Sequence, residues 1–93
     1  MIAPAARPAL AAKARLRFDH ASGGYMLLYP ERGLALNPTA ASILKLCNGE
    51  LTVDAIVEQL QREYAERPAP ELRKDVLDFL EEMSRRGLLQ VAG

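Results

Sequence analysis

The sequence predicts an α+β domain that is winged helix-turn-helix-like, with a three-stranded antiparallel meander followed by three helices. Apolar residues between positions 15 and 36 recur with the two-residue period of strands, and from position 37 onward they recur with the period of helices. Strands and helices segregated in this way form α+β folds. The 93 residues allow one domain. We expect residues 1–12 to be a disordered tail and residues 13–93 to form the domain.

Three short segments have the pattern of strands. Arg15–Asp19 alternates apolar and charged residues, which is typical of a half-buried strand. After a Gly-Gly turn, Tyr25–Tyr29 is apolar on both faces, so we expect it to be the central strand, with one face covered by the core. Its second apolar face either takes part in binding or is covered by the tail or by a partner subunit. A turn from Pro30 to Gly33 leads into the third strand, Leu34–Leu36. In such a meander the first and third strands have free edges.

Helix-capping residues divide the rest of the chain into three helices. Asn37 begins the first helix and Gly49 ends it, Thr52 caps the second, and the third runs from Pro70 to Gly87. The apolar stripes expected to face the core are Ala40, Ile43, Leu44 and Cys47 in the first helix, Val53, Ile56, Val57, Leu60 and Tyr64 in the second, and Leu72, Val76, Phe79, Leu80 and Met83 in the third.

The composition argues against two classes of function. The formal net charge is zero, whereas a dedicated nucleic-acid binder usually carries a basic excess. The charge is uneven: residues 1–45 hold six basic and two acidic side chains, and residues 46–93 hold six and ten. This asymmetry either orients a charged partner or is surface drift. The sequence also offers no catalytic pair of nucleophile and general base. Cys47 lies on an apolar stripe without a neighbouring base, and His20, the single histidine, lies in a turn.

We therefore expect no catalytic residue, no cofactor, no metal site and no intrachain disulfide. The segment Met1–Ala12 lacks the charged region followed by an apolar run that a secretory signal has. No apolar stretch approaches the roughly 18 residues that span a bilayer. These features favour a cytoplasmic protein.

One feature of the third helix indicates binding. Leu77 lies beyond Arg73 and Ser84 around the helix, and it widens the apolar arc past what a single core contact needs. If the strand Leu34–Leu36 runs beside this helix, its open edge and Leu77 form an apolar groove. Such a groove fits peptide recognition by strand addition. An ordinary thick core stripe is the competing interpretation.

Several motifs, in order and spacing, resemble the PqqD family of pyrroloquinoline quinone (PQQ) biosynthesis, over roughly residues 13–90. They are the run Leu27-Leu28-Tyr29-Pro30-Glu31-Arg32-Gly33, then Leu36-Asn37-Pro38-Thr39-Ala40 and Leu46-Cys47-Asn48-Gly49, and later Asp75-Val76-Leu77-Asp78-Phe79-Leu80 and Arg86-Gly87-Leu88-Leu89.

The resemblance implies a winged helix-turn-helix module that is a precursor-peptide recognition element without a cofactor of its own. Such a peptide chaperone binds the precursor peptide PqqA and presents it to PqqE, a radical S-adenosylmethionine (SAM) enzyme that cross-links a Glu and a Tyr of the peptide. It implies that the backbone of Leu34, Ala35 and Leu36 pairs with the peptide. It also implies that the other wall of the groove consists of Arg73, Leu77, Leu80 and Ser84.

Two alternatives stay open. A DNA-binding winged-helix protein would place its third helix in the major groove, but residues 71–86 carry five acidic and four basic side chains, which phosphates would repel. A purely structural dimer would bury the apolar strand face without binding a peptide. The oligomeric state, monomer or homodimer, does not follow from the sequence.

Overall fold

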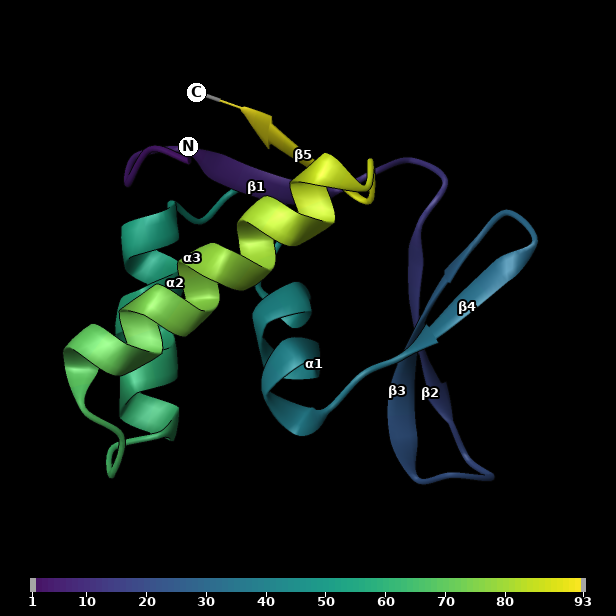
Figure 1. The fold of residues 1–93 in the computed structure, drawn as a ribbon, viewed down its shortest axis with the longest axis horizontal. Coiled ribbons are helices and arrows are strands. Elements are labelled where there is room, and N and C mark those ends of the chain that lie inside the picture. Colours follow the sequence, from purple (N-terminus) through teal and green to yellow (C-terminus); the bar gives the residue numbers. More distant parts are fainter. Residues whose placement is uncertain (1, 93) are drawn as a thin grey trace.

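The computed structural model describes residues 2–92, which form two small sheets and three helices (Figure 1). The predicted α+β class and the meander followed by three helices are confirmed; the second sheet was not predicted. The elements are β1 (Arg7–Leu10), β2 (Arg15–Asp19), β3 (Gly24–Tyr29), β4 (Arg32–Ala35), α1 (Pro38–Lys45), α2 (Val53–Glu63), α3 (Ala69–Arg85) and β5 (Leu89–Ala92).

The N-terminal segment differs from the prediction of a disordered tail. β1 pairs antiparallel with β5, from Arg7 opposite Ala92 to Leu10 opposite Leu89, and Ala6 is buried beside it. The carbonyl oxygens of Ala6 and Pro4 accept hydrogen bonds from the N–H groups of Val53 and Asp54, at 2.9 and 3.1 Å. Those amides open α2 and have no partner within the helix. The segment is therefore held by a distant strand and by a helix end, neither of which its own composition reveals.

The helices form as the capping residues predict. The side-chain oxygen of Asn37 accepts a hydrogen bond from the Ala40 N–H at 2.8 Å, and that of Thr52 accepts one from the Ala55 N–H at 3.1 Å. The third helix begins slightly earlier than predicted, at Ala69. The predicted stripes are buried except for Tyr64 and Phe79, which are half-buried at the margin of the core. No helix of the described residues is long and apolar enough to cross a membrane.

The three-stranded sheet lies to one side of the helical part, with α1 next to it (Figure 1). Leu27 at its centre is fully buried, and Leu16 and Leu34 flank it on the same face. The turn before β4 contains only two residues, because Glu31 adopts a positive φ of 63° after Pro30. β4 therefore begins at Arg32, two residues before the predicted strand.

Candidate peptide-binding site

The hydrogen-bond register of β4 decides which backbone groups face its free edge. β4 pairs with β3 on one side only, in the strand order β2-β3-β4. The N–H of Leu36 donates to the carbonyl oxygen of Tyr25 at 3.0 Å, so this opposed pair is hydrogen-bonded. Hydrogen-bonded and non-hydrogen-bonded pairs alternate along an antiparallel ladder. Leu34, opposite Leu27, therefore also points its backbone groups toward β3.

The same alternation turns the N–H and C=O groups of Gly33 and Ala35 outward. They are spaced two residues apart, as an added antiparallel or parallel strand requires. Of the three strand residues predicted to pair with a peptide, Leu34, Ala35 and Leu36, only Ala35 has its backbone groups on the free edge. Gly33 was missed, because its outward orientation depends on the two-residue turn before it.

Gly33 also allows the neighbouring side chains to lie close to the strand. A Cβ atom at this position would lie 3.1 Å from the Met26 Cε and 3.3 Å from the Leu28 Cδ2. Both distances are tighter than ordinary carbon contacts. Glycine at position 33 therefore lets the Met26 and Leu28 side chains pack directly against the backbone of β4. Ala35, the other residue at the edge, is exposed and has a small side chain.

The four α3 residues predicted to form the groove wall do not line one common open surface. Leu80 is fully buried in the core, so it cannot line an open groove. Arg73 and Leu77 line a hollow of about 540 Å³ with Ile2 and Pro4, and Arg73 forms an ion pair with Asp54 at 2.7 Å.

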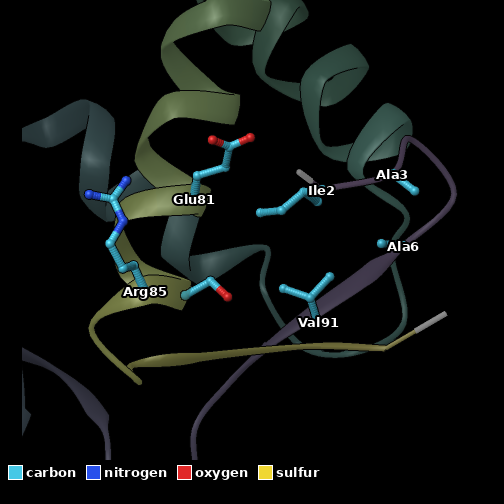
Figure 2. Close-up of a pocket in the computed structure, with 7 residues that line it drawn as sticks. Ile2, Ala3, Ala6, Glu81, Arg85 and Val91 are labelled. Atoms are coloured by element: carbon cyan, nitrogen blue, oxygen red, sulfur yellow. The ribbon is translucent and has the colours of Figure 1, made fainter.

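Ser84 lines a second hollow, of about 470 Å³, on the same flank of α3. In Figure 2, Ile2, Ala6 and Val91 surround this hollow together with Glu81 and Arg85 of α3. This flank of α3 therefore faces the N-terminal segment and β5. The sequence did not reveal that the N-terminal segment and β5 lie beside Arg73, Leu77 and Ser84, so the role of these residues in one groove with β4 stays a prediction, and Leu80 is buried.

The opposite flank of α3 faces the start of α1. A hollow of about 400 Å³ separates the two helices, and its lining includes Asn37 and Thr39 on one side and Asp75, Asp78 and Phe79 on the other. Asn37 lies two residues after Ala35, so this hollow begins close to where the free edge of β4 ends. Phe79 is the large apolar side chain on this flank, and its half-buried position marks it as a candidate contact.

The charged groups around this hollow are already paired. Arg67 forms an ion pair with Asp75, and Lys74 forms one with Asp78 at 2.7 Å. The hydrogen bond that Arg67 donates to Asp75 raises the pKa of Arg67, and the one that Lys74 donates to Asp78 raises the pKa of Lys74. Both carboxylates therefore already accept a hydrogen bond from a cationic side chain of this chain. Apolar contact at Phe79 and backbone bonds at β4 are thus the interactions that the site offers a ligand.

Cys47 is buried as predicted. Its Sγ lies 3.3 Å from the carbonyl oxygen of Ile43, and burial raises the pKa of the thiol to about 12. Because the thiolate is the nucleophilic form, this thiol is inert near neutral pH. Within the part of the chain that the structure describes, no three His, Cys, Asp or Glu side chains gather as metal ligands would.

An α+β domain with an open strand edge, next to a hollow between helices that contains Phe79, has the geometry of strand-addition binding modules. Residues 24–89 match the family model described as Coenzyme PQQ synthesis protein D (PqqD), and the chain belongs to this family. The match confirms the resemblance seen in the sequence.

Curated relatives extend the similarity to almost the whole chain. The PqqA binding protein of Rhodopseudomonas palustris (strain BisB5) is 40% identical over 91 residues, which cover 98% of this chain and 88% of the relative. The PqqA binding protein of Bradyrhizobium diazoefficiens is 35% identical over 91 residues, covering 98% and 87%. The N-terminal segment is thus part of what these relatives share with this chain.

Two solved structures resemble the fold. The solution NMR structure of the PqqD truncation of Methylobacterium extorquens PqqCD, a stand-alone recognition element for ribosomally synthesised and post-translationally modified peptides, superposes with a TM-score of 0.79 at 30% identity and covers 97% of this chain and 95% of its own. The crystal structure of PqqD from Xanthomonas campestris gives a TM-score of 0.58 at 29% identity, covering 97% and 99%.

Proposed function

We propose that this chain is the peptide chaperone of PQQ biosynthesis: it binds the precursor peptide PqqA along the free edge of β4 and presents it to the radical SAM enzyme PqqE. The observation that supports this most directly is the outward orientation of Gly33 and Ala35, in a member of the PqqD family whose relatives are named PqqA binding proteins. The chain acts in the cytoplasm and contributes binding, not catalysis.

The backbone bonds alone are too weak for the task. The N–H and C=O groups of Gly33 and Ala35 offer up to four hydrogen bonds, each of about 1 kcal/mol net. Micromolar binding corresponds to about 8 kcal/mol. The difference has to come largely from apolar side chains of the peptide, and these need a pocket close to the edge.

The hollow at Phe79 is the pocket that we assign to this role. A strand added to β4 places every second side chain on the face that carries Leu34, which is the face toward the helices. Farther along, beyond Ala35, the peptide reaches the hollow between α1 and α3. Burying one Leu- or Phe-sized side chain there contributes about 1.5–3 kcal/mol. Two such contacts bring the total near the micromolar range.

Strand addition also explains how presentation works. An added peptide is held extended, and its alternate side chains lie on the outer face of the sheet, away from the helices. A Glu and a Tyr on that side remain accessible to PqqE. The free edge and the hollow at Phe79 both belong to one chain, so a monomer is sufficient for binding.

Calorimetric titration of the purified chain with synthetic PqqA tests the proposal. We expect saturable binding with one peptide per chain, and no binding of a duplex DNA of matched charge at the same salt concentration. Sedimentation velocity with and without PqqA separates the chaperone from a purely structural dimer. Tight DNA binding, or a stable dimer that ignores PqqA, would refute the proposal.

A further inference from the structure

The outer face of the three-stranded sheet combines apolar and basic side chains. Leu27 marks the inner face because it is fully buried, so the neighbouring Met26 and Leu28 point to the outer face. Their cross-strand partners on β2 are Arg17 and Arg15. Met26 and Leu28 are only half-buried, and they lean over Gly33 of β4. The result is an apolar strip bordered by two guanidinium groups.

A hollow lies at the β2 side of this face, next to Met26 and Leu28. It measures about 350 Å³, and its lining includes Arg17, Phe18, His20, Met26 and Leu28. Phe18, two residues after Leu16, points to the inner face and only borders this hollow at the end of β2. The N-terminal segment contributes nothing to this lining, because it pairs with β5 instead. The expected cover of this face by the tail is therefore absent in residues 2–12.

The basic side chains on this face have no acidic partner among the described residues. Every ion pair among the described residues joins side chains of the helical part, between Asp54 and Arg85. Neither Arg15 nor Arg17 takes part in one. Asp19 lies on the same face, but its carboxylate accepts a hydrogen bond from the Ala21 N–H at 3.2 Å within the turn. A hydrogen bond from the Ser22 side chain and the charge of Arg17 both lower the pKa of Asp19. Neither arginine forms an ion pair among the described residues, so both guanidinium groups can accept a carboxylate of another molecule as a partner.

We propose that this outer face, consisting of Arg15, Arg17, Met26 and Leu28, docks a partner protein whose contact surface carries carboxylates around apolar side chains. The inference rests on the proposed function, in which that partner is the enzyme that modifies the peptide. Charge complementarity selects an acidic partner, and the half-buried Met26 and Leu28 supply the apolar contact.

The topology places this surface where presentation needs it. β2 and β4 are the two opposite edges of one sheet, so a peptide on β4 leaves β2 and its outer face open. A peptide added to β4 continues the same sheet, and its outward side chains lie on the same face as Met26 and Leu28. A protein docked on this face is therefore adjacent to the peptide side chains that it has to reach.

A matched pair of charge reversals tests the inference. Arg15→Glu/Arg17→Glu changes the outer face, and Arg62→Glu/Arg85→Glu makes the same change in net charge at exposed arginines of the helical part. Calorimetry or interferometry measures the Kd of each variant for PqqA, and the Kd of each peptide-loaded variant for PqqE. We expect the outer-face variant to bind PqqE at least about tenfold more weakly. Its Kd for PqqA stays within about twofold of the parent, and the control behaves like the parent in both assays.

Each other outcome has a definite meaning. Equal PqqE binding by the parent and the outer-face variant overturns the inference but leaves the proposed function intact. A parent chain that binds PqqA but not PqqE overturns the proposed presentation step, and the inference with it. Loss of PqqA binding in the outer-face variant, or loss of self-association in sedimentation, assigns the face to the peptide or to a second copy and overturns the inference. If the charge reversal unfolds the sheet, Arg15→Gln/Arg17→Gln removes the charges alone and gives the same test.

Discussion

Replacing Ala35 by proline should abolish PqqA binding and leave the domain folded. The Ala35 N–H points to the free edge, so proline removes no bond of the β3–β4 ladder, and its fixed φ suits an edge strand. Proline also favours an extended conformation at the preceding residue, which Leu34 already has in β4. The ring, however, removes one donor and crowds the added strand. Losing the four edge bonds costs about 4 kcal/mol, or roughly a thousandfold in Kd.

Leu34→Pro is the matched control, one residue away. The Leu34 N–H points to β3, and the half-buried side chain packs against the core from the position opposite Leu27. This substitution removes a ladder bond and a core contact, so it should lower the melting temperature strongly. Calorimetric titration and thermal melts of both variants measure the two effects. If Ala35→Pro folds and binds PqqA like the parent, strand addition at β4 is the wrong mechanism; if Leu34→Pro melts like the parent, the register is wrong.

Three further predictions concern α3 and the buried Cys47. Phe79→Ala should weaken PqqA binding by about 1–2 kcal/mol because it removes apolar surface from the hollow beside α1. Leu77→Ala, on the flank that faces Ile2 and Pro4, should lower the stability of the domain and leave the Kd for PqqA unchanged. Calorimetry and thermal melts compare the two variants, and the reverse pattern would mean that the peptide binds on the flank of Leu77. Cys47→Ser should keep binding and lose about 1–2 kcal/mol of unfolding free energy, since a buried hydroxyl finds one partner, the Ile43 carbonyl. Burial raises the pKa of Cys47 from 9.0 to about 12, so the thiol loses its proton at a lower pH in the unfolded chain than in the folded one, and the free energy of unfolding falls as the pH rises above 9. Chemical denaturation at pH 8 and pH 10 should show a smaller fall for Cys47→Ala than for the parent. An equal fall in the two proteins would contradict the burial of the thiol.

Local features of the fold could be predicted from the sequence, and non-local ones could not. The strands β2 and β3 and the caps Asn37 and Thr52 depend on neighbouring residues, and they lie where the patterns indicate. β1 depends on a partner strand at the other end of the chain and on the free amides of α2, so an Ala/Pro-rich segment gives no sign of it.

The candidate site shows the same division. Periodicity indicates that α3 has an apolar face wider than the core needs, but it does not show which segment covers each flank. Ile2 and Val91 cover the flank with Leu77 and Ser84, which leaves Phe79 on the open side. Likewise, an extended segment around Ala35 is predictable, but the choice between the Leu34 and Ala35 amides depends on the two-residue turn at Glu31.

Amide hydrogen exchange of β4, measured residue by residue by NMR with and without saturating PqqA, tests the central claim most directly. In the free protein the Gly33 and Ala35 amides should exchange faster than those of Leu34 and Leu36, which bond to β3. With PqqA bound, we expect Gly33 and Ala35 to slow by at least about tenfold more than Leu34 and Leu36 do. Unchanged exchange at Gly33 and Ala35 in the saturated complex would contradict strand addition at this edge.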